Sequence, residues 1–136
     1  MKKYKTTCAV VLNAKKELLL IKRAREPFKG VWALVSGVGG TKKGLVPAEA
    51  VRDEVYYDLD VPFDGKFVFS VPAENDQFSD EILVFKGTVD ETKIHPNPKV
   101  ISEFRWFAQK DVRNLDTLAF EHKIILDRIE RDDKYR

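Results

Sequence analysis

Two carboxylates, Glu54 and Asp58, lie four residues apart in a segment with the apolar spacing of an α-helix. At 100° per residue, Glu54 falls about 60° and Asp58 about 20° from the apolar Val51, whereas Asp53 falls on the opposite side. The pair therefore borders the predicted buried stripe, where a charge needs a partner. A divalent cation such as Mg²⁺ would neutralise both carboxylates, and the alternative is that each pairs with Lys or Arg or caps a loop.

A glycine-rich segment precedes this predicted helix. Its glycines are Gly37, Gly39, Gly40 and Gly44. Glycine permits sharp turns and a close approach of the backbone to a ligand, and a helix start exposes N–H groups. A tight loop with a purely structural role needs the same residues. The glycines therefore indicate a ligand site only because of their spacing to Glu54 and Asp58.

A sheet and two helices are needed to position these groups. The first helix is predicted from Pro47 to Leu59, with Pro62 just beyond its end, and a second helix from Thr117 to Arg131. Strand-length apolar runs cover residues 6–12, 18–21, 31–35, 63–71, 81–89 and 104–107. This order of elements favours an α/β fold in which helices cover a mixed sheet.

Length and charge exclude several classes of protein. A chain of 136 residues predicts one domain over 1–136, and 24 basic against 22 acidic residues give no bulk attraction for nucleic acid. No apolar run is long enough for a membrane span, so we expect a cytoplasmic protein. The single cysteine, Cys8, lies in an apolar run and is interpreted as a core residue rather than a reactive thiol.

Residues 39–61 resemble the Nudix box in register and without a gap. Gly39, Glu54, Val55 and Val61 match the family pattern, and Asp58 is a shortened match to the second of its paired glutamates. The resemblance is to the Nudix hydrolase superfamily, and within it to the ADP-ribose pyrophosphatase and MutT-like branches. It extends over nearly the whole chain, through residues 18–34, 103–107 and 119–122, and implies a Nudix-type α/β/α sandwich with a mixed sheet.

Four positions depart from the family pattern. Leu45 stands in place of the first glutamate and Asp53 in place of the arginine that usually pairs with it. Because both charges are lost together, neither is left unpaired. Tyr57 replaces the first of the paired glutamates and so removes a metal ligand, and Asp60 replaces a glycine, which its backbone can tolerate.

The resemblance implies Mg²⁺- or Mn²⁺-dependent hydrolysis of a diphosphate linkage in a nucleoside diphosphate derivative. Carried over by position, Glu54 and Asp58 would be the catalytic metal ligands, and the carbonyl of Gly39 would complete the set. Arg23 would contact the diphosphate and Glu103 would supply a further carboxylate at the substrate, although a surface ion pair would also explain either residue. The loops 72–80 and 93–99 lie where the family recognises the rest of its substrates.

Two functions remain open at this point. One is the metal-dependent hydrolase, weakened by the altered box. The other is a Nudix-fold module that binds or senses a nucleotide without cleaving it. Phe28 and Trp32 either stack on a base or belong to the core, His122 is assigned no catalytic role, and the oligomeric state is open, a homodimer included.

Overall fold

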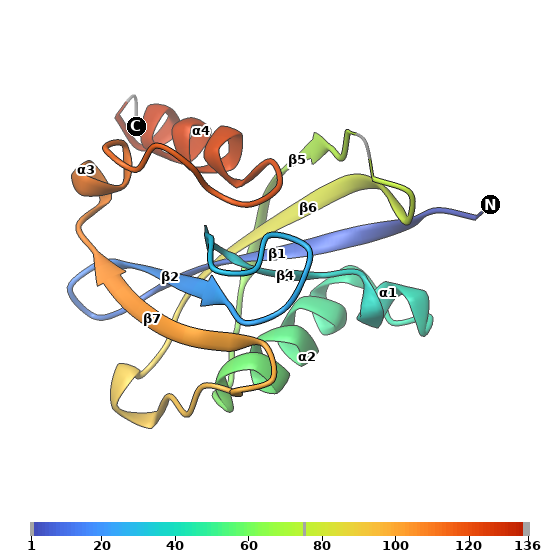
Figure 1. Ribbon diagram of the computed structural model, residues 1–136, viewed down its shortest axis with the longest axis horizontal. Helices are drawn as coiled ribbons and strands as arrows, with labels where there is room; N and C mark the ends of the chain where they lie inside the picture. The colour runs from blue at the N-terminus through green and yellow to red at the C-terminus, as the bar shows by residue number, and fades with distance from the viewer. Residues whose placement is uncertain (1, 75, 135–136) are drawn as a thin grey trace.

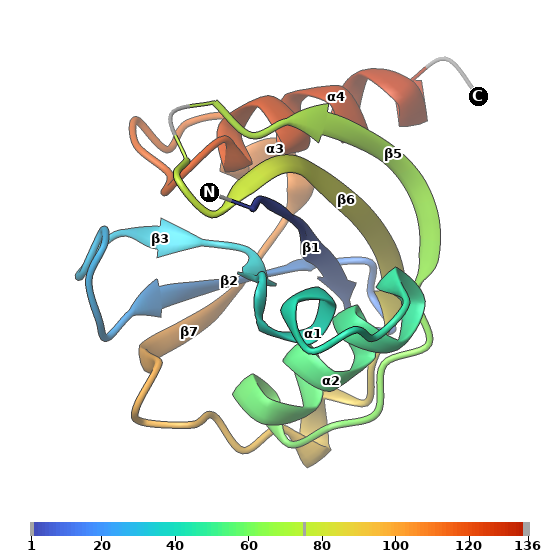
Figure 2. The same ribbon diagram turned by 90° about the vertical axis from the view of Figure 1, so that its right-hand side faces the viewer.

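A mixed β-sheet lies between two layers of helices (Figures 1 and 2). The structure, a computed structural model, describes residues 2–74 and 76–134. Helices α1 (Gly39–Lys42) and α2 (Pro47–Leu59) cover one face, and α3 (Gln109–Val112) and α4 (His122–Lys134) cover the other. The predicted α/β sandwich is confirmed.

Two groups of strands meet in the sheet. Its strands are β1 (Tyr4–Leu12), β2 (Leu18–Arg23), β3 (Trp32–Ala33), β4 (Val35–Gly37), β5 (Lys66–Pro72), β6 (Ser79–Thr88) and β7 (Ile101–Phe107). Strand β1 pairs in parallel with β6 and antiparallel with β4. Strand β2 pairs antiparallel with β3 and β7, and β5 forms the edge beyond β6. The parallel β1–β6 pair makes the sheet mixed, as expected.

Each face of the sheet has its own apolar core. On the α2 face, Val51, Val55 and Leu59 pack against strand residues such as Phe85. On the α4 face, α4 packs against residues that include Cys8, which is fully buried. Burial raises the pKa of the Cys8 thiol, so this cysteine is an unreactive core residue, as predicted.

Helix α2 has the ends that its sequence predicts. Pro47 occupies the first turn, where no backbone N–H is needed. Asp60 follows the last turn in the left-handed region, with φ of 58°. It therefore adopts the backbone conformation that the family's glycine provides, and Asp is among the residues that tolerate it.

Besides shifts of up to three residues at strand ends, the structure differs from the predicted elements in three places. The predicted strand 31–35 divides at Leu34, because β3 pairs with β2 whereas β4 pairs with β1. Residues 39–42 of the glycine-rich segment form the short helix α1, since Gly40 can approach Ala50 of α2 closely. The last helix begins at His122 rather than at Thr117, and Phe120 just before it has φ of 54°.

Among the described residues, no helix is long and apolar enough to cross a membrane. The cytoplasmic location stays a prediction.

Candidate metal and phosphate site

The apolar stripe of α2 fixes where its carboxylates lie. Because Val51, Val55 and Leu59 face the sheet, Asp58 is carried into the protein and is only 4% exposed. Glu54 lies one turn earlier on the same side of the helix and is half-buried. The structure therefore brings the predicted pair together at the boundary between helix and sheet.

The carboxylate of Glu54 lies against the backbone of Gly37, at the end of β4. A Cβ added at Gly37 would coincide with Glu54 Oε1. A side chain at position 37 would therefore have to displace the Glu54 carboxylate from this place. The contact joins the last residue of a sheet strand to the middle of α2, and it fixes the position of the Glu54 side chain.

The two carboxylates hold protons more tightly than free carboxylates do. Burial raises the pKa of Glu54 to about 9, and the charge of Asp58 and a side-chain hydrogen bond with it act in the same direction. Burial also raises the pKa of Asp58, but the hydrogen bond from Glu54 and the positive charges of Arg25 and Arg23 oppose that rise. In the metal-free protein, Glu54 is therefore the protonated partner at neutral pH.

One polar atom at this site has no partner. Asp58 Oδ1 is buried and makes no hydrogen bond to any described residue. A buried carboxylate oxygen without a donor costs free energy, and proteins seldom leave one in this state. Its surroundings therefore suit a cation.

The C-terminal end of α2 is held by the loop that follows the 3₁₀ turn Glu91–Lys93. The backbone N–H groups of His95 and Asn97 donate to the carbonyls of Leu59 and Asp58, each at 2.9 Å. Asn97 Nδ2 also donates to the carbonyl of Tyr57 at 3.3 Å. The loop 93–99, which we expected to recognise substrate, thus uses these groups to cap the helix turn that carries Asp58.

Arg23 reaches this site from the end of β2. Its positive charge acts on both Glu54 and Asp58. Arg23 Nε donates to the carbonyl of Pro27 at 2.6 Å, and the guanidinium lies 5.0 Å from the centre of the Phe120 ring. Its two terminal nitrogens donate no hydrogen bond to any described residue. The planar guanidinium therefore has its outer edge free for an anion.

Glu103 is not brought to the pair. It lies opposite Lys22 in the β2–β7 ladder, on the face that carries Trp32 and packs toward α4. Glu103 Oε2 accepts from Arg105 at 2.7 Å, and Lys22 lies 3.5 Å away. Arg105 lowers the pKa of Glu103. The surface ion pair, the alternative left open by the sequence, accounts for this residue.

The structure shows the surroundings of two positions that depart from the Nudix box, Asp53 and Tyr57, and of Gly39, which matches it. Lys43 and Asp53 form an ion pair at 3.2 Å, so Asp53 is compensated although the family's arginine is absent. Tyr57 is 53% exposed and adds no carboxylate to the site. The carbonyl of Gly39 accepts from the Lys43 N–H at 3.1 Å within α1 and keeps a second lone pair.

His122, to which the sequence assigns no catalytic role, has a structural role that the sequence does not reveal. It is 1% exposed, and its Nδ1 accepts the N–H of Leu34 at 3.0 Å. The ring proton is then on Nε2, which lies 3.3 Å from Ser36 Oγ. Burial, together with the charge of Arg23, lowers the pKa of His122 to about 3. This neutral histidine links α4 to the strand that ends at Gly37.

The residues present fit one divalent cation. No group of three or more His, Cys, Asp or Glu side chains is arranged for a metal within the described residues. A cation bound between Glu54 and Asp58 would therefore complete its shell with backbone carbonyl, water and substrate oxygens. Mg²⁺ accepts this kind of shell, because it is commonly bound by one or two carboxylates and retains several waters.

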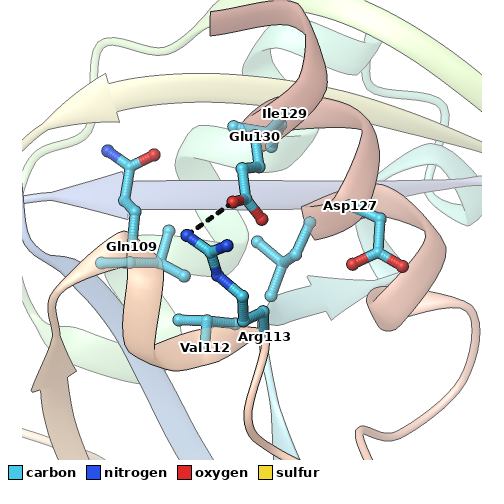
Figure 3. Close-up of a pocket in the computed structure, with 8 residues that line it drawn as sticks. Gln109, Val112, Arg113, Asp127, Ile129 and Glu130 are labelled. Carbon is cyan, nitrogen blue, oxygen red and sulfur yellow. Dashed lines mark ion pairs between the residues drawn. The ribbon is translucent and has the colours of Figure 1, made fainter. Parts of the chain in front are cut away.

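A small cavity on the opposite face is not a candidate site. It lies between β2, α3 and α4, has a volume of about 20 Å³, and can hold no more than a water molecule (Figure 3). Arg113 and Glu130 form an ion pair at 3.0 Å beside it. It is a packing defect under the C-terminal helix.

The NUDIX domain family model matches residues 2–129. This chain belongs to the NUDIX domain family. The resemblance seen in residues 39–61 is thereby confirmed over almost the full length. No curated protein matches the chain.

Solved structures of similar fold agree with this assignment. The NUDIX domain of Shewanella oneidensis NrtR, crystallised with ADP ribose, is 17% identical with a TM-score of 0.79, covering 97% of this chain and 89% of its own. A MutT protein from Methanosarcina mazei is 17% identical with a TM-score of 0.77, and the match covers 98% of this chain and 99% of the Methanosarcina chain. A bifunctional NMN adenylyltransferase/ADP ribose pyrophosphatase from Francisella tularensis is 17% identical with a TM-score of 0.71, covering 95% of this chain but 41% of its own. Membership of this family supports a hydrolase.

Proposed function

We propose that this NUDIX protein is a divalent-metal-dependent hydrolase that cleaves a diphosphate linkage in a nucleoside diphosphate derivative. The observation that carries the proposal is the pair formed by half-buried Glu54 and buried Asp58, with an unpartnered oxygen on Asp58 and a glycine backbone against Glu54. A purely structural ion pair would place a cationic side chain between the carboxylates. Here the two carboxyl groups instead interact with each other.

Glu54 and Asp58 would hold Mg²⁺ or Mn²⁺, with the carbonyl of Gly39 as a backbone ligand. When bound, the cation would neutralise charge on phosphate oxygens and lower the pKa of a coordinated water. Gly37 keeps the Glu54 carboxylate in place, and the loop that contains Asn97 keeps the last turn of α2 in place. Both carboxylates must lose their protons to bind the cation.

Arg23 would bind the diphosphate of the substrate. Its guanidinium has a free outer edge and carries the charge needed beside phosphate oxygens. The negative charge of the carboxyl pair acts on it across the site. Glu103, paired with Arg105 on the other face of the sheet, takes no part in the proposed site.

A nucleotide-binding module without turnover is the second candidate function. The observation that favours it is the small number of acidic metal ligands. Tyr57 supplies no carboxylate and Glu103 lies elsewhere, so among the described residues only Glu54 and Asp58 form the candidate site. Such a module would be stabilised by nucleotides, because a ligand that binds the native state raises its stability. It would release no product.

Product release from a panel of nucleoside diphosphate derivatives, ADP-ribose among them, separates the two functions. The protein is assayed with Mg²⁺ or Mn²⁺ beside Glu54→Gln and Glu49→Gln. Glu49 is an exposed carboxylate in the first turn of the same helix, so its variant matches the charge change away from the site. The hydrolase predicts turnover that Glu54→Gln abolishes and Glu49→Gln preserves. Nucleotide-dependent thermal stabilisation without turnover would favour the module, and turnover unchanged by Glu54→Gln would refute the proposed site.

A further inference from the structure

Two phenylalanines with left-handed backbone conformations meet beside Arg23. Phe28 has φ of 61° and Phe120 has φ of 54°. Bulky side chains rarely adopt this conformation, and such residues concentrate at functional sites. The two come from loops that are far apart in the sequence, yet their ring centres are 4.9 Å apart in an edge-to-face arrangement.

The turn between β2 and β3 holds Phe28 in place. Its carbonyl accepts the N–H of Val31 at 3.1 Å, and the N–H of Gly30 donates to the carbonyl of Arg23 at 2.8 Å. The N–H of Lys29 donates to Glu26 at 3.2 Å. The turn is therefore held by its own hydrogen bonds, and the Phe28 ring is held against Phe120.

Phe28 is the member of the pair that is open to solvent. Phe28 is 43% exposed, so part of it is in contact with solvent. Phe120 is already engaged, by Arg23 at 5.0 Å and by the His122 ring at 5.5 Å. Phe120 thus acts as the support, and Phe28 has ring surface available to a ligand.

The exposed ring and the phosphate-binding group are parts of one assembly. Arg23 contacts the ring of Phe120 on one side, and its charge acts on Glu54 and Asp58 on the other. A ligand that placed an anionic group on Arg23 would therefore have Phe28 within reach of its remainder. Any nucleotide base can stack on a phenylalanine ring, because every base has a π face whatever hydrogen-bonding groups it carries.

We propose that Phe28, supported by Phe120, is the stacking surface for the aromatic base of a ligand whose phosphate is bound by Arg23. This rests on the proposed function and adds to it the residue that would recognise the base of the nucleotide. It also selects between the two aromatic residues that the sequence singled out. Trp32 packs on Phe107 at 5.6 Å and carries Lys22 and Arg105 on the α4 face, away from the carboxylates.

Binding of AMP and of ribose 5-phosphate, measured by calorimetry, tests the stacking surface. The two probes share the sugar and the phosphate and differ only in the base, and neither contains the diphosphate linkage, so binding is measured without turnover. The variants are Phe28→Leu, which keeps an apolar side chain unbranched at Cβ, and Phe28→Trp, which restores an aromatic ring. Phe67→Leu is the matched control, since Phe67 is an exposed phenylalanine on the edge strand β5.

We expect Phe28→Leu to weaken AMP binding by about 5- to 150-fold, the usual range for loss of a base-stacking ring. Ribose 5-phosphate should bind equally to both proteins, Phe28→Trp should keep AMP affinity, and Phe67→Leu should change neither. Three results overturn the stacking surface: AMP affinity unaffected by Phe28→Leu, an equal loss for both probes, or no binding of either probe by the unmodified protein. Hydrolysis sensitive to Glu54→Gln would survive any of these, so the two proposals fail separately.

Discussion

Glu54 Oε1 occupies the space that a side chain at Gly37 would need. Gly37→Ala should therefore push the carboxylate out of place. Misplacement of a catalytic group by about 1 Å can cost about 100-fold in rate, and we expect a loss of turnover and of Mn²⁺ affinity on that scale. Turnover assays and Mn²⁺ titration check this. An alanine variant with normal turnover would show that the Glu54 position is not critical.

The interacting carboxyl groups of Glu54 and Asp58 should lower the stability of the metal-free protein at neutral and alkaline pH. A carboxyl whose folded-state pKa is raised to about 9 retains its proton where the unfolded chain, with a pKa near 4.5, has lost it. Stability contributed by this group is therefore lost as the pH rises from about 4.5 to about 9. Glu54→Gln removes this titration and keeps a donor toward Asp58.

Glu54→Gln should therefore raise the unfolding free energy at pH 8 in a chelator by about 1 kcal/mol or more, since one pKa unit corresponds to about 1.4 kcal/mol. Chemical denaturation at pH 5 and pH 8 measures it, and the gain should be smaller at pH 5. Glu49→Gln, on the exposed first turn, should show no such gain. A Glu54→Gln protein that is less stable than the unmodified protein at pH 8 would contradict the raised pKa of Glu54.

The buried His122 predicts a pH dependence of the opposite kind. Its pKa is lowered to about 3, whereas the unfolded chain has a value near 6.5. The unfolded state therefore takes up a proton that the folded state does not, and stability falls as the pH drops from about 6.5 toward 3. His122→Asn keeps an acceptor for the Leu34 N–H but removes the titration.

The destabilisation caused by His122→Asn should thus be largest at pH 7 and smaller by about 1–3 kcal/mol at pH 4.5. Paired denaturation curves at the two pH values measure the difference. A gap between variant and unmodified protein that does not depend on pH would mean that His122 is not held neutral.

Asn97 should stabilise the end of α2 that carries Asp58. Its side chain donates to the carbonyl of Tyr57 and accepts the N–H of Lys99 at 3.0 Å. Asn97→Ala should cost about 1 kcal/mol of unfolding free energy per hydrogen bond lost. Asn97→Asp keeps the acceptor and loses only the donor, so it should cost less. Thermal unfolding of the three proteins gives this order, and equal stabilities would show that the cap is dispensable.

The sequence predicts the elements and the carboxylate pair better than it predicts their surroundings. Helical periodicity alone places Glu54 and Asp58 on the face that the structure buries, and the strand runs are found with small errors at their ends. The division at Leu34 and the late start of α4 depend on His122 and on pairing between distant strands. No local pattern encodes contacts of that kind.

Side-chain direction explains why the structure brings some of the predicted site residues to the carboxylates and not others. Glu103 and Arg23 lie on neighbouring strands, yet only Arg23 faces the carboxylates, because successive side chains of β2 point to opposite faces of the sheet and Glu103 is paired with Lys22, not with Arg23. The contact between Gly37 and Glu54 likewise follows from the packing of α2 on β4, and the glycine content of the segment does not reveal which glycine is needed.

Direct Mn²⁺ binding is the measurement that tests the account most directly. Free Mn²⁺ is followed by electron paramagnetic resonance during titration of the unmodified protein, Glu54→Gln and Glu49→Gln. We predict one saturable site per chain that is lost in Glu54→Gln and kept in Glu49→Gln. No saturable binding by the unmodified protein, or equal binding by Glu54→Gln, would contradict a metal site at Glu54 and Asp58.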